Sequence, residues 1–202
     1  ILELTDSGSY LGIVTALQFL PTLFFSVSGG KIADKFNKRK VLMFTNLTGG
    51  LSALSVGTLV LTDNIKIWHV MFFAFTLGMG NAIDAPVRQS FNVEVVGKAD
   101  LPNAVGLNSA NFNTGRLIGP GLSGLLIAAY GTGVSFILNG ISYLIVIVAL
   151  LNIRESDLFR EERKSSSTQI REALRYVAAR PDILSVMITV FFATSFGLNF
   201  NI

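Results

Sequence analysis

The side chains best suited to bind a polar ligand lie close together in one apolar segment of this 202-residue chain. At helical spacing, Ser109, Asn113 and Arg116 share one side of a helix, and Asn108 and Asn111 occupy an adjacent side. Arg116 would lie about 18 Å from the nearer end of that helix, close to the middle of a bilayer. A cation at that depth is costly unless it faces a cavity or a partner. These residues therefore indicate a binding surface inside a membrane protein.

Small residues and a proline surround Arg116. Gly115, Gly119 and Gly124 allow a second helix to approach closely. Pro120 removes a main-chain hydrogen bond, so that the helix can bend. The pattern predicts a tightly packed, kinked helix. A purely structural role for Arg116 stays open, in which it bonds a carbonyl that Pro120 leaves free or a neighbouring carboxylate.

A second pair of ionisable residues lies earlier in the chain. Asp84 and Arg88 are four residues apart and can form an ion pair across one helical turn. The chain has no Cys and a single His, His69, which beside Trp68 fits a membrane-interface position better than a proton relay. Because the sequence offers no thiolate, no His cluster and no paired carboxylates at depth, we expect no enzymatic activity, no metal site and no cofactor.

Composition places these residues in a membrane. Hydrophobic residues make up 50% of the chain and charged residues 14%, against about 25% charged in an ordinary soluble domain. About 20 apolar residues cross a bilayer, and five segments have roughly that length, with a sixth beginning near the C-terminal end. The predicted spans are Ser9–Gly30, Val41–Thr62, Ile67 to about Asp84, Ala104–Tyr130, Thr132–Ile153 and, in part, Ile183–Ile202.

Basic residues are sorted into alternate connectors. Of the 16 Lys and Arg residues, five lie in 30–40, two in 88–103 and seven in 154–182, whereas the intervening connectors carry only Lys66. Because positively charged connectors resist translocation, we expect these three loops on the cytoplasmic face of the plasma membrane. The net charge of +3 follows from this topology and does not indicate binding to nucleic acid.

The chain divides into three predicted parts. They are a transmembrane bundle (1–153), a cytoplasmic linker (154–182) and a further membrane segment (183–202). Within the linker, Ile170, Leu174 and Val177 recur at helical spacing. This stripe predicts an amphipathic helix along the inner membrane surface, whereas an ordinary solvated loop would explain the charges but not the apolar side.

Two motifs resemble the major facilitator superfamily of transporters. One is the connector 30–40, GKIADKFNKRK, which resembles that family's loop between helices 2 and 3, of pattern Gly-x-Leu-Ala-Asp-Arg-x-Gly-Arg-Lys/Arg. The other is the segment 115–124, GRLIGPGLSG, which resembles the helix 5 signature Gly-x-x-x-Gly-Pro-x-x-Gly-Gly of proton-coupled exporters. The stretch 84–120 is similar to bacterial enterobactin-exporter-like and macrolide-efflux-like drug exporters.

The resemblance implies an all-α polytopic membrane protein with the major facilitator fold. The chain would supply helices 2 to 6 of the N-terminal six-helix half, without the first helix, and the start of helix 7 of the C-terminal bundle. It would belong to a secondary transporter that exports small organic molecules by alternating access and proton antiport.

The resemblance also implies a gating network on the cytoplasmic side. Helix 4 of that family ends near the loop between helices 2 and 3, so Asp84 is expected to meet Lys38 or Arg39 as well as Arg88. The predicted gating loop and network consist of Gly30, Asp34, Lys38, Arg39, Asp84 and Arg88. A static surface salt bridge is the alternative interpretation.

Two other functions stay open at this point. An importer built on the same fold would share these features, and a non-transporting scaffold would keep the same loops. Gly119-Pro120 favours export, and Arg116 disfavours a scaffold because a scaffold gains nothing from a charge in the membrane. The expected partners of this monomer are a small-molecule substrate, protons and the lipid bilayer. The sequence does not identify the substrate. Within the predicted spans only Asp84, at an inner end, is acidic, which leaves open a coupling carboxylate in the first helix or the second half of the transporter, or an indirect role of Arg116.

Overall fold

The computed structural model describes residues 2–5, 7–159, 175–177 and 179–193. Over these residues the chain is helical, and it contains no strand. The elements are α1 (Leu2–Thr5), α2 (Gly8–Lys35), α3 (Lys38–Leu61), α4 (Ile67–Val96), α5 (Leu101–Asn152), a short 3-10 turn η1 (Glu155–Asp157) and α7 (Pro181–Phe192). In the described part, α2, α3, α4 and α5 are long and apolar enough to cross a membrane.

Two helices continue past the apolar spans that the sequence predicts. Helix α2 runs through Gly30 to Lys35, so that the connector to α3 is only Phe36 and Asn37. Helix α4 runs twelve residues beyond Asp84, to Val96, so the first half of the predicted loop 88–103 is helical. Helical hydrogen bonds do not depend on a lipid environment, and a helix can therefore extend into water. The helices therefore extend beyond the predicted spans.

Helix α5 contains two spans. Its 52 residues would extend about 78 Å as one rod, far more than a bilayer is thick. The helical geometry is broken at Gly131, where φ is 79° and ψ is 170°, a conformation that side chains disfavour. The break confirms the predicted turn between Tyr130 and Thr132. The backbone stays helical around Pro120, so the helix is not broken at this residue.

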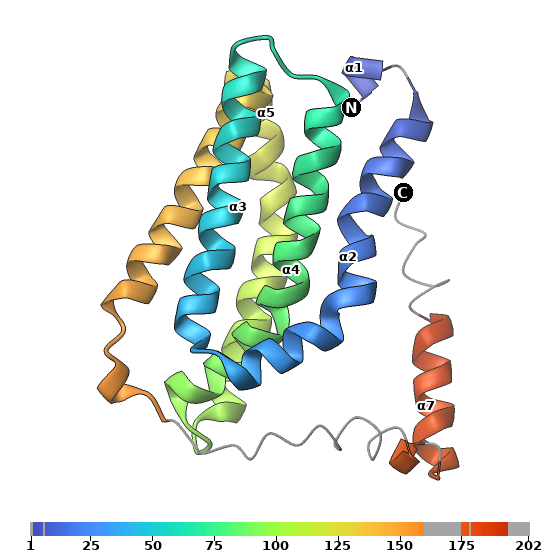
Figure 1. Ribbon diagram of the computed structural model, residues 1–202, viewed down its shortest axis with the longest axis vertical. Coiled ribbons are helices and arrows are strands. Elements are labelled where there is room, and N and C mark those ends of the chain that lie inside the picture. Colours follow the sequence, from blue (N-terminus) through green and yellow to red (C-terminus); the bar gives the residue numbers. More distant parts are fainter. Residues whose placement is uncertain (1, 6, 160–174, 178, 194–202) are drawn as a thin grey trace. The chain divides into compact units, whose positions relative to one another are not determined.

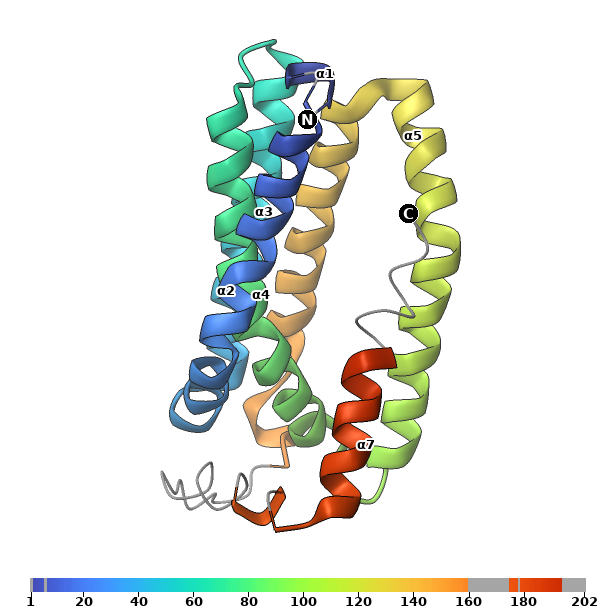
Figure 2. The same cartoon turned by 90° about the vertical axis from the view of Figure 1, so that its right-hand side faces the viewer.

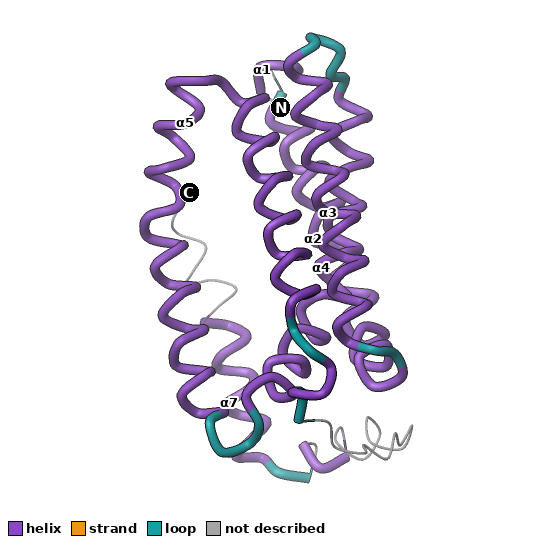
Figure 3. Tube along the Cα trace, turned by 90° about the vertical axis from the view of Figure 1, so that its left-hand side faces the viewer, coloured by secondary structure: helices purple, strands orange, loops and turns teal. Residues whose placement is uncertain are grey.

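The long helices alternate in direction, as Figures 1 and 2 show. The connector 36–37, the connector 97–100 and the end of α5 lie at one end of the bundle, which we call the inner end. The connector 62–66 and the break at Gly131 lie at the opposite end (Figure 3). The three segments with an excess of basic residues therefore start from the same end, as the charge pattern predicts.

The bundle is packed tightly on one side and open on the other. Helix α2 packs on α4, and α3 packs on α4 and on the second half of α5. At Gly78 the main chains come so close that a Cβ atom would overlap the main-chain oxygen of Gln18. An apolar cluster joins the inner parts of four helices; its buried members are Ala33, Leu42, Val87, Phe91 and Leu150. By contrast, no residue of 101–130 is buried.

The chain forms two compact units, 1–162 and 163–202. In the second unit, Arg180 bonds Asp182 at 3.3 Å where α7 begins. Most of the predicted amphipathic helix falls outside the described residues, although 175–177 are helical. The predicted domain boundaries at 153/154 and 182/183 stay predictions.

Candidate functional site

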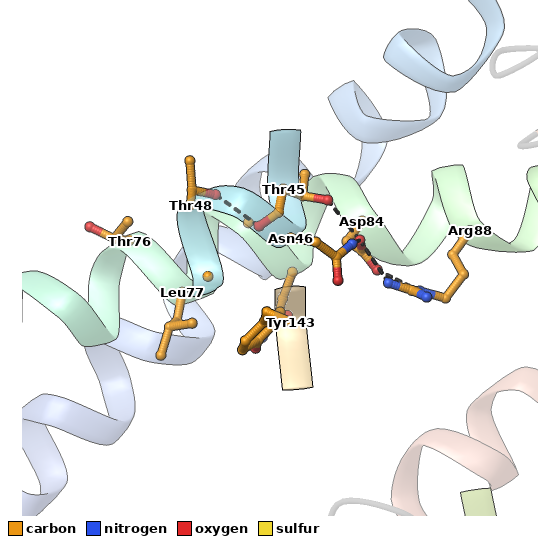
Figure 4. Close-up of a pocket in the computed structure, with 11 residues that line it drawn as sticks. Thr45, Asn46, Thr48, Thr76, Leu77, Asp84, Arg88 and Tyr143 are labelled. Carbon is orange, nitrogen blue, oxygen red and sulfur yellow. Dashed lines mark hydrogen bonds and ion pairs between the residues drawn. The ribbon is translucent and has the colours of Figure 1, made fainter. Parts of the chain in front are cut away.

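Donors from two helices hold the carboxylate of Asp84 (Figure 4). On α4, Arg88 donates through Nε at 2.7 Å and through Nη2 at 3.1 Å. From α3, Thr45 Oγ1 lies 2.7 Å from Oδ1 of Asp84, and Asn46 Nδ2 lies 3.4 Å from the same atom. The side chain of Asp84 is 18% exposed and that of Arg88 is 44% exposed. The ion pair expected from the four-residue spacing is present, and α3 adds two further donors.

A polar cavity of about 150 Å³ adjoins this carboxylate. Hydroxyl and amide groups of α3 and α4 line it, and the ring of Tyr143 closes it from the second half of α5 (Figure 4). The full lining is Thr45, Asn46, Thr48, Gly49, Thr76, Leu77, Gly80, Asn81, Asp84, Arg88 and Tyr143. A polar space of this size has room for several water molecules. Such a site can hydrate a carboxylate and pass protons to and from it.

The connector between α2 and α3 is tied to two other helices, in a set of contacts that we call the inner clasp. Lys38 Nζ lies 2.5 Å from Oε1 of Glu94 on α4, and both side chains are largely buried. Arg39 donates to the main-chain oxygens of Leu150 and Leu151, at 2.7 and 2.8 Å. Glu155 adds two contacts: Asn37 Nδ2 donates to its Oε1 at 3.1 Å, and Arg39 Nη1 lies 4.0 Å from the same atom. The inner clasp thus comprises Asn37, Lys38, Arg39, Glu94, Leu150, Leu151 and Glu155.

The expected contact of Asp84 with Lys38 or Arg39 was wrong. Because α4 continues to Val96, Asp84 lies about three turns before the inner end, whereas Lys38 and Arg39 lie in the first turn of α3 at that end. Glu94 is the carboxylate at their level. Asp84 is level with Thr45 instead, two turns further into α3.

The two other predicted members of the network lie in α2. Asp34 is exposed in the last turn, and Gly30 is half-buried one turn earlier. Neither contributes to the contacts given above for Asp84 or for the inner clasp. Their gating role stays a prediction.

The polar side chains around Arg116 are exposed on the first half of α5. The structure describes Arg116, Ser109 and Asn113 as exposed, and Asn113 Nδ2 donates to the main-chain oxygen of Ser109 at 2.9 Å. Asn108 and Asn111 are exposed as well. The expected tight packing at this helix is not seen in unit 1–162: a Cβ atom added at Gly115, Gly119 or Gly124 would meet open space.

Among the residues of these two sites that the sequence did not indicate are Thr45, Asn46, Glu94, Tyr143 and Glu155. For Glu94 a signal was present. Helices α3 and α4 are antiparallel and joined at 62–66, so residues at similar distances from that connector lie side by side. Counting back from the connector would have placed Glu94 near Lys38.

Known proteins are similar to the chain in sequence. Residues 1–199 match the major facilitator family described as "Transmembrane secretion effector". The chain belongs to the major facilitator superfamily. The chain is accordingly an all-α, multi-pass part of a plasma-membrane protein, as the sequence predicts.

Several curated major facilitator proteins are similar to the chain. The staphyloferrin A transporter of Staphylococcus aureus is 31% identical over 75% of this chain and 38% of its own length. The multidrug efflux pump Tap of Mycolicibacterium fortuitum is 32% identical over 64% of this chain and 34% of its own length. Multidrug resistance protein 2 of Bacillus subtilis is 28% identical over 96% of this chain and 48% of its own length. The chain thus spans between a third and a half of the length of these relatives. No solved structure matches it significantly.

Proposed function

We propose that the chain is the N-terminal half of a secondary transporter that exports small organic molecules across the plasma membrane by alternating access with proton antiport. The names of the similar proteins, a multidrug efflux pump and a multidrug resistance protein among them, support export of organic compounds. The absence of Cys and of paired carboxylates at depth supports transport rather than enzymatic chemistry.

The observation that carries this proposal is the inner clasp. In alternating access, two bundles rock as bodies about a site near the middle of the membrane. A bundle can move as a body only if its helix ends move together. Lys38 ties α3 to α4 and Arg39 ties α3 to the end of α5, which joins three inner helix ends.

Asp84 is the proposed gate within this body. It is the only acidic residue inside the predicted spans, and it binds Arg88 beside a polar cavity. A proton on Asp84 would remove the charge that holds Arg88 and would loosen the contact with Thr45. Asp84 and Arg88, together with Asp34, Lys38 and Arg39, would stabilise the state in which the inner side is closed.

The test uses the full-length protein in proteoliposomes with an imposed proton gradient. Movement of three fluorescent dyes, the cation ethidium, the anion carboxyfluorescein and an uncharged dye, is followed together with the pH inside the vesicles. The variants are Asp84→Asn and, as a control, Lys40→Gln, which removes an exposed charge of α3. We expect outward dye movement coupled to inward proton flux in the wild type and in Lys40→Gln, and loss of both in Asp84→Asn.

Other results would contradict parts of the proposal. Dye movement without proton flux would leave a facilitator in place of an antiporter. Inward dye accumulation driven by the gradient would favour the importer. If folded protein moved neither ethidium nor an anionic or uncharged dye, the scaffold interpretation would replace transport.

A further inference from the structure

The charge of Arg116 is not balanced within the described bundle. Three other basic side chains of the bundle have partners: Lys38 bonds Glu94, Arg39 bonds carbonyl oxygens of α5, and Arg88 bonds Asp84. Helix α5 itself contains no Asp or Glu between Leu101 and Asn152. In the part of the chain that the structure describes, no hydrogen bond or ion pair reaches Arg116.

The surroundings of Arg116 are uncharged donors. Asn113 and Ser109 lie on the same side of the helix, one and two turns away from Arg116 respectively, and all three side chains are exposed. The amide of Asn113 turns toward the backbone of its own helix. Asp84, the carboxylate at depth, is already surrounded by donors on α3 and α4. This half of α5 therefore presents one positive charge and several hydrogen-bond donors at mid-membrane depth.

We propose that Arg116 binds an acidic group of the transported molecule, so that the substrate is an amphipathic organic anion carrying a carboxylate, sulfonate or phosphate. This inference rests on the proposed transport function. A guanidinium presents a planar fork of donors that matches such groups, and the pair is strong where water is scarce. A cation in the membrane is tolerated when it meets an opposite charge, whereas an organic cation would be repelled there. The exposed amides of Asn108 and Asn111 lie on the adjacent side and extend the polar surface.

The test measures binding and transport separately, with the full-length protein. Carboxyfluorescein serves as the anion and ethidium as the cation. Equilibrium binding in detergent is followed by fluorescence anisotropy, and transport is followed in proteoliposomes. The variants are Arg116→Gln, Arg116→Lys and the control Lys98→Gln, which removes an exposed charge outside the span. Thermal unfolding establishes that each variant is folded.

We expect the wild type to bind carboxyfluorescein more tightly than ethidium. Arg116→Gln should weaken carboxyfluorescein binding by about 30-fold or more, the usual effect of removing one partner of a hydrogen-bonded charge pair, and should not weaken ethidium binding. Arg116→Lys keeps the charge and loses the fork, so it should weaken binding less, by under about tenfold. Lys98→Gln should bind like the wild type. If Arg116→Gln does not fold, the test rests on Arg116→Lys, which should bind carboxyfluorescein more weakly than the wild type does.

Failure of this inference and failure of the transport proposal give different results. Transport of ethidium by a protein that does not prefer carboxyfluorescein would overturn the anion site and leave transport in place. An equal loss of carboxyfluorescein and ethidium binding in the folded Arg116 variants would also overturn the anion site. It would assign Arg116 to an ion pair within the protein. Arginine-dependent binding of carboxyfluorescein without any transport would support the anion site and contradict the transport function.

Discussion

The Nε atom of Arg39 lies 2.7 Å from the main-chain oxygen of Leu150, so a side chain from the first turn of α3 closes the last turn of α5. The last carbonyls of a helix have no partner within the helix and need one from elsewhere. Arg39 supplies two bonds, because its Nη2 atom also donates to Leu151 at 2.8 Å. One residue thereby joins two helices whose sequence positions are more than a hundred residues apart.

Substitution of Arg39 should therefore destabilise the bundle. Arg39→Ala leaves two carbonyls without a protein partner, and we expect a loss of about 1–3 kcal/mol in the free energy of unfolding. Arg39→Lys should recover part of this loss, because a lysine offers a charge but not the fork. The neighbouring exposed residue provides the control, Lys40→Ala, which should change little. Unfolding of the purified protein in detergent measures the effect, and equal stabilities of Arg39→Ala and Lys40→Ala would contradict it.

Asp84 and Arg88 should contribute unequally although they form one ion pair. Asp84→Ala removes the acceptor for donors of both α3 and α4, and we expect a loss of about 1–3 kcal/mol. Arg88→Ala should cost less than about 1 kcal/mol, because its side chain is 44% exposed and leaves Asp84 with Thr45 and Asn46. Denaturant unfolding of the two variants compares them. A larger effect at Arg88 would show that the contacts to α3 matter little.

Two glycines of α4 should respond oppositely to alanine. At Gly78 a Cβ atom would overlap the main-chain oxygen of Gln18, which cannot move without shifting α2. Gly78→Ala should lower the free energy of unfolding by about 1–3 kcal/mol, the usual cost of adding atoms to a well-packed interior. At Gly80 nothing lies within 4 Å, so Gly80→Ala should be neutral or stabilise the helix by up to about 1 kcal/mol. The melting temperatures of the two variants measure this difference, and similar values would contradict the close crossing of α2 and α4.

The turn between the two spans of α5 should depend on Gly131. With φ at 79° and ψ at 170°, Gly131→Ala should cost about 1–3 kcal/mol through backbone strain alone, because no neighbouring atom would contact the new methyl group. Gly121→Ala, which adds a methyl group in open space within the same helix, is the matched control. Thermal unfolding in detergent compares the two, and equal stabilities would place the turn elsewhere.

The sequence alone was sufficient for the properties that depend on local composition. Apolar length predicted the spans, the distribution of Lys and Arg grouped the connectors at one end, and the motifs around Gly30 and Gly119 identified the superfamily, which the family match confirms. The pair Asp84–Arg88 was also predictable, because residues four apart always lie side by side on a helix.

Only the tertiary structure determined which residues of different helices meet. The partners of Lys38 and Arg39 depend on where α4 and α5 end, and apolar length does not give those ends because helices continue into water. The donors from Thr45 and Asn46 to Asp84 depend on how α3 and α4 are aligned along their length. Each of these helices is also fixed by another neighbour, because α3 packs closely on the second half of α5 and α4 packs closely on α2 at small residues. Those contacts join segments that are far apart in the sequence.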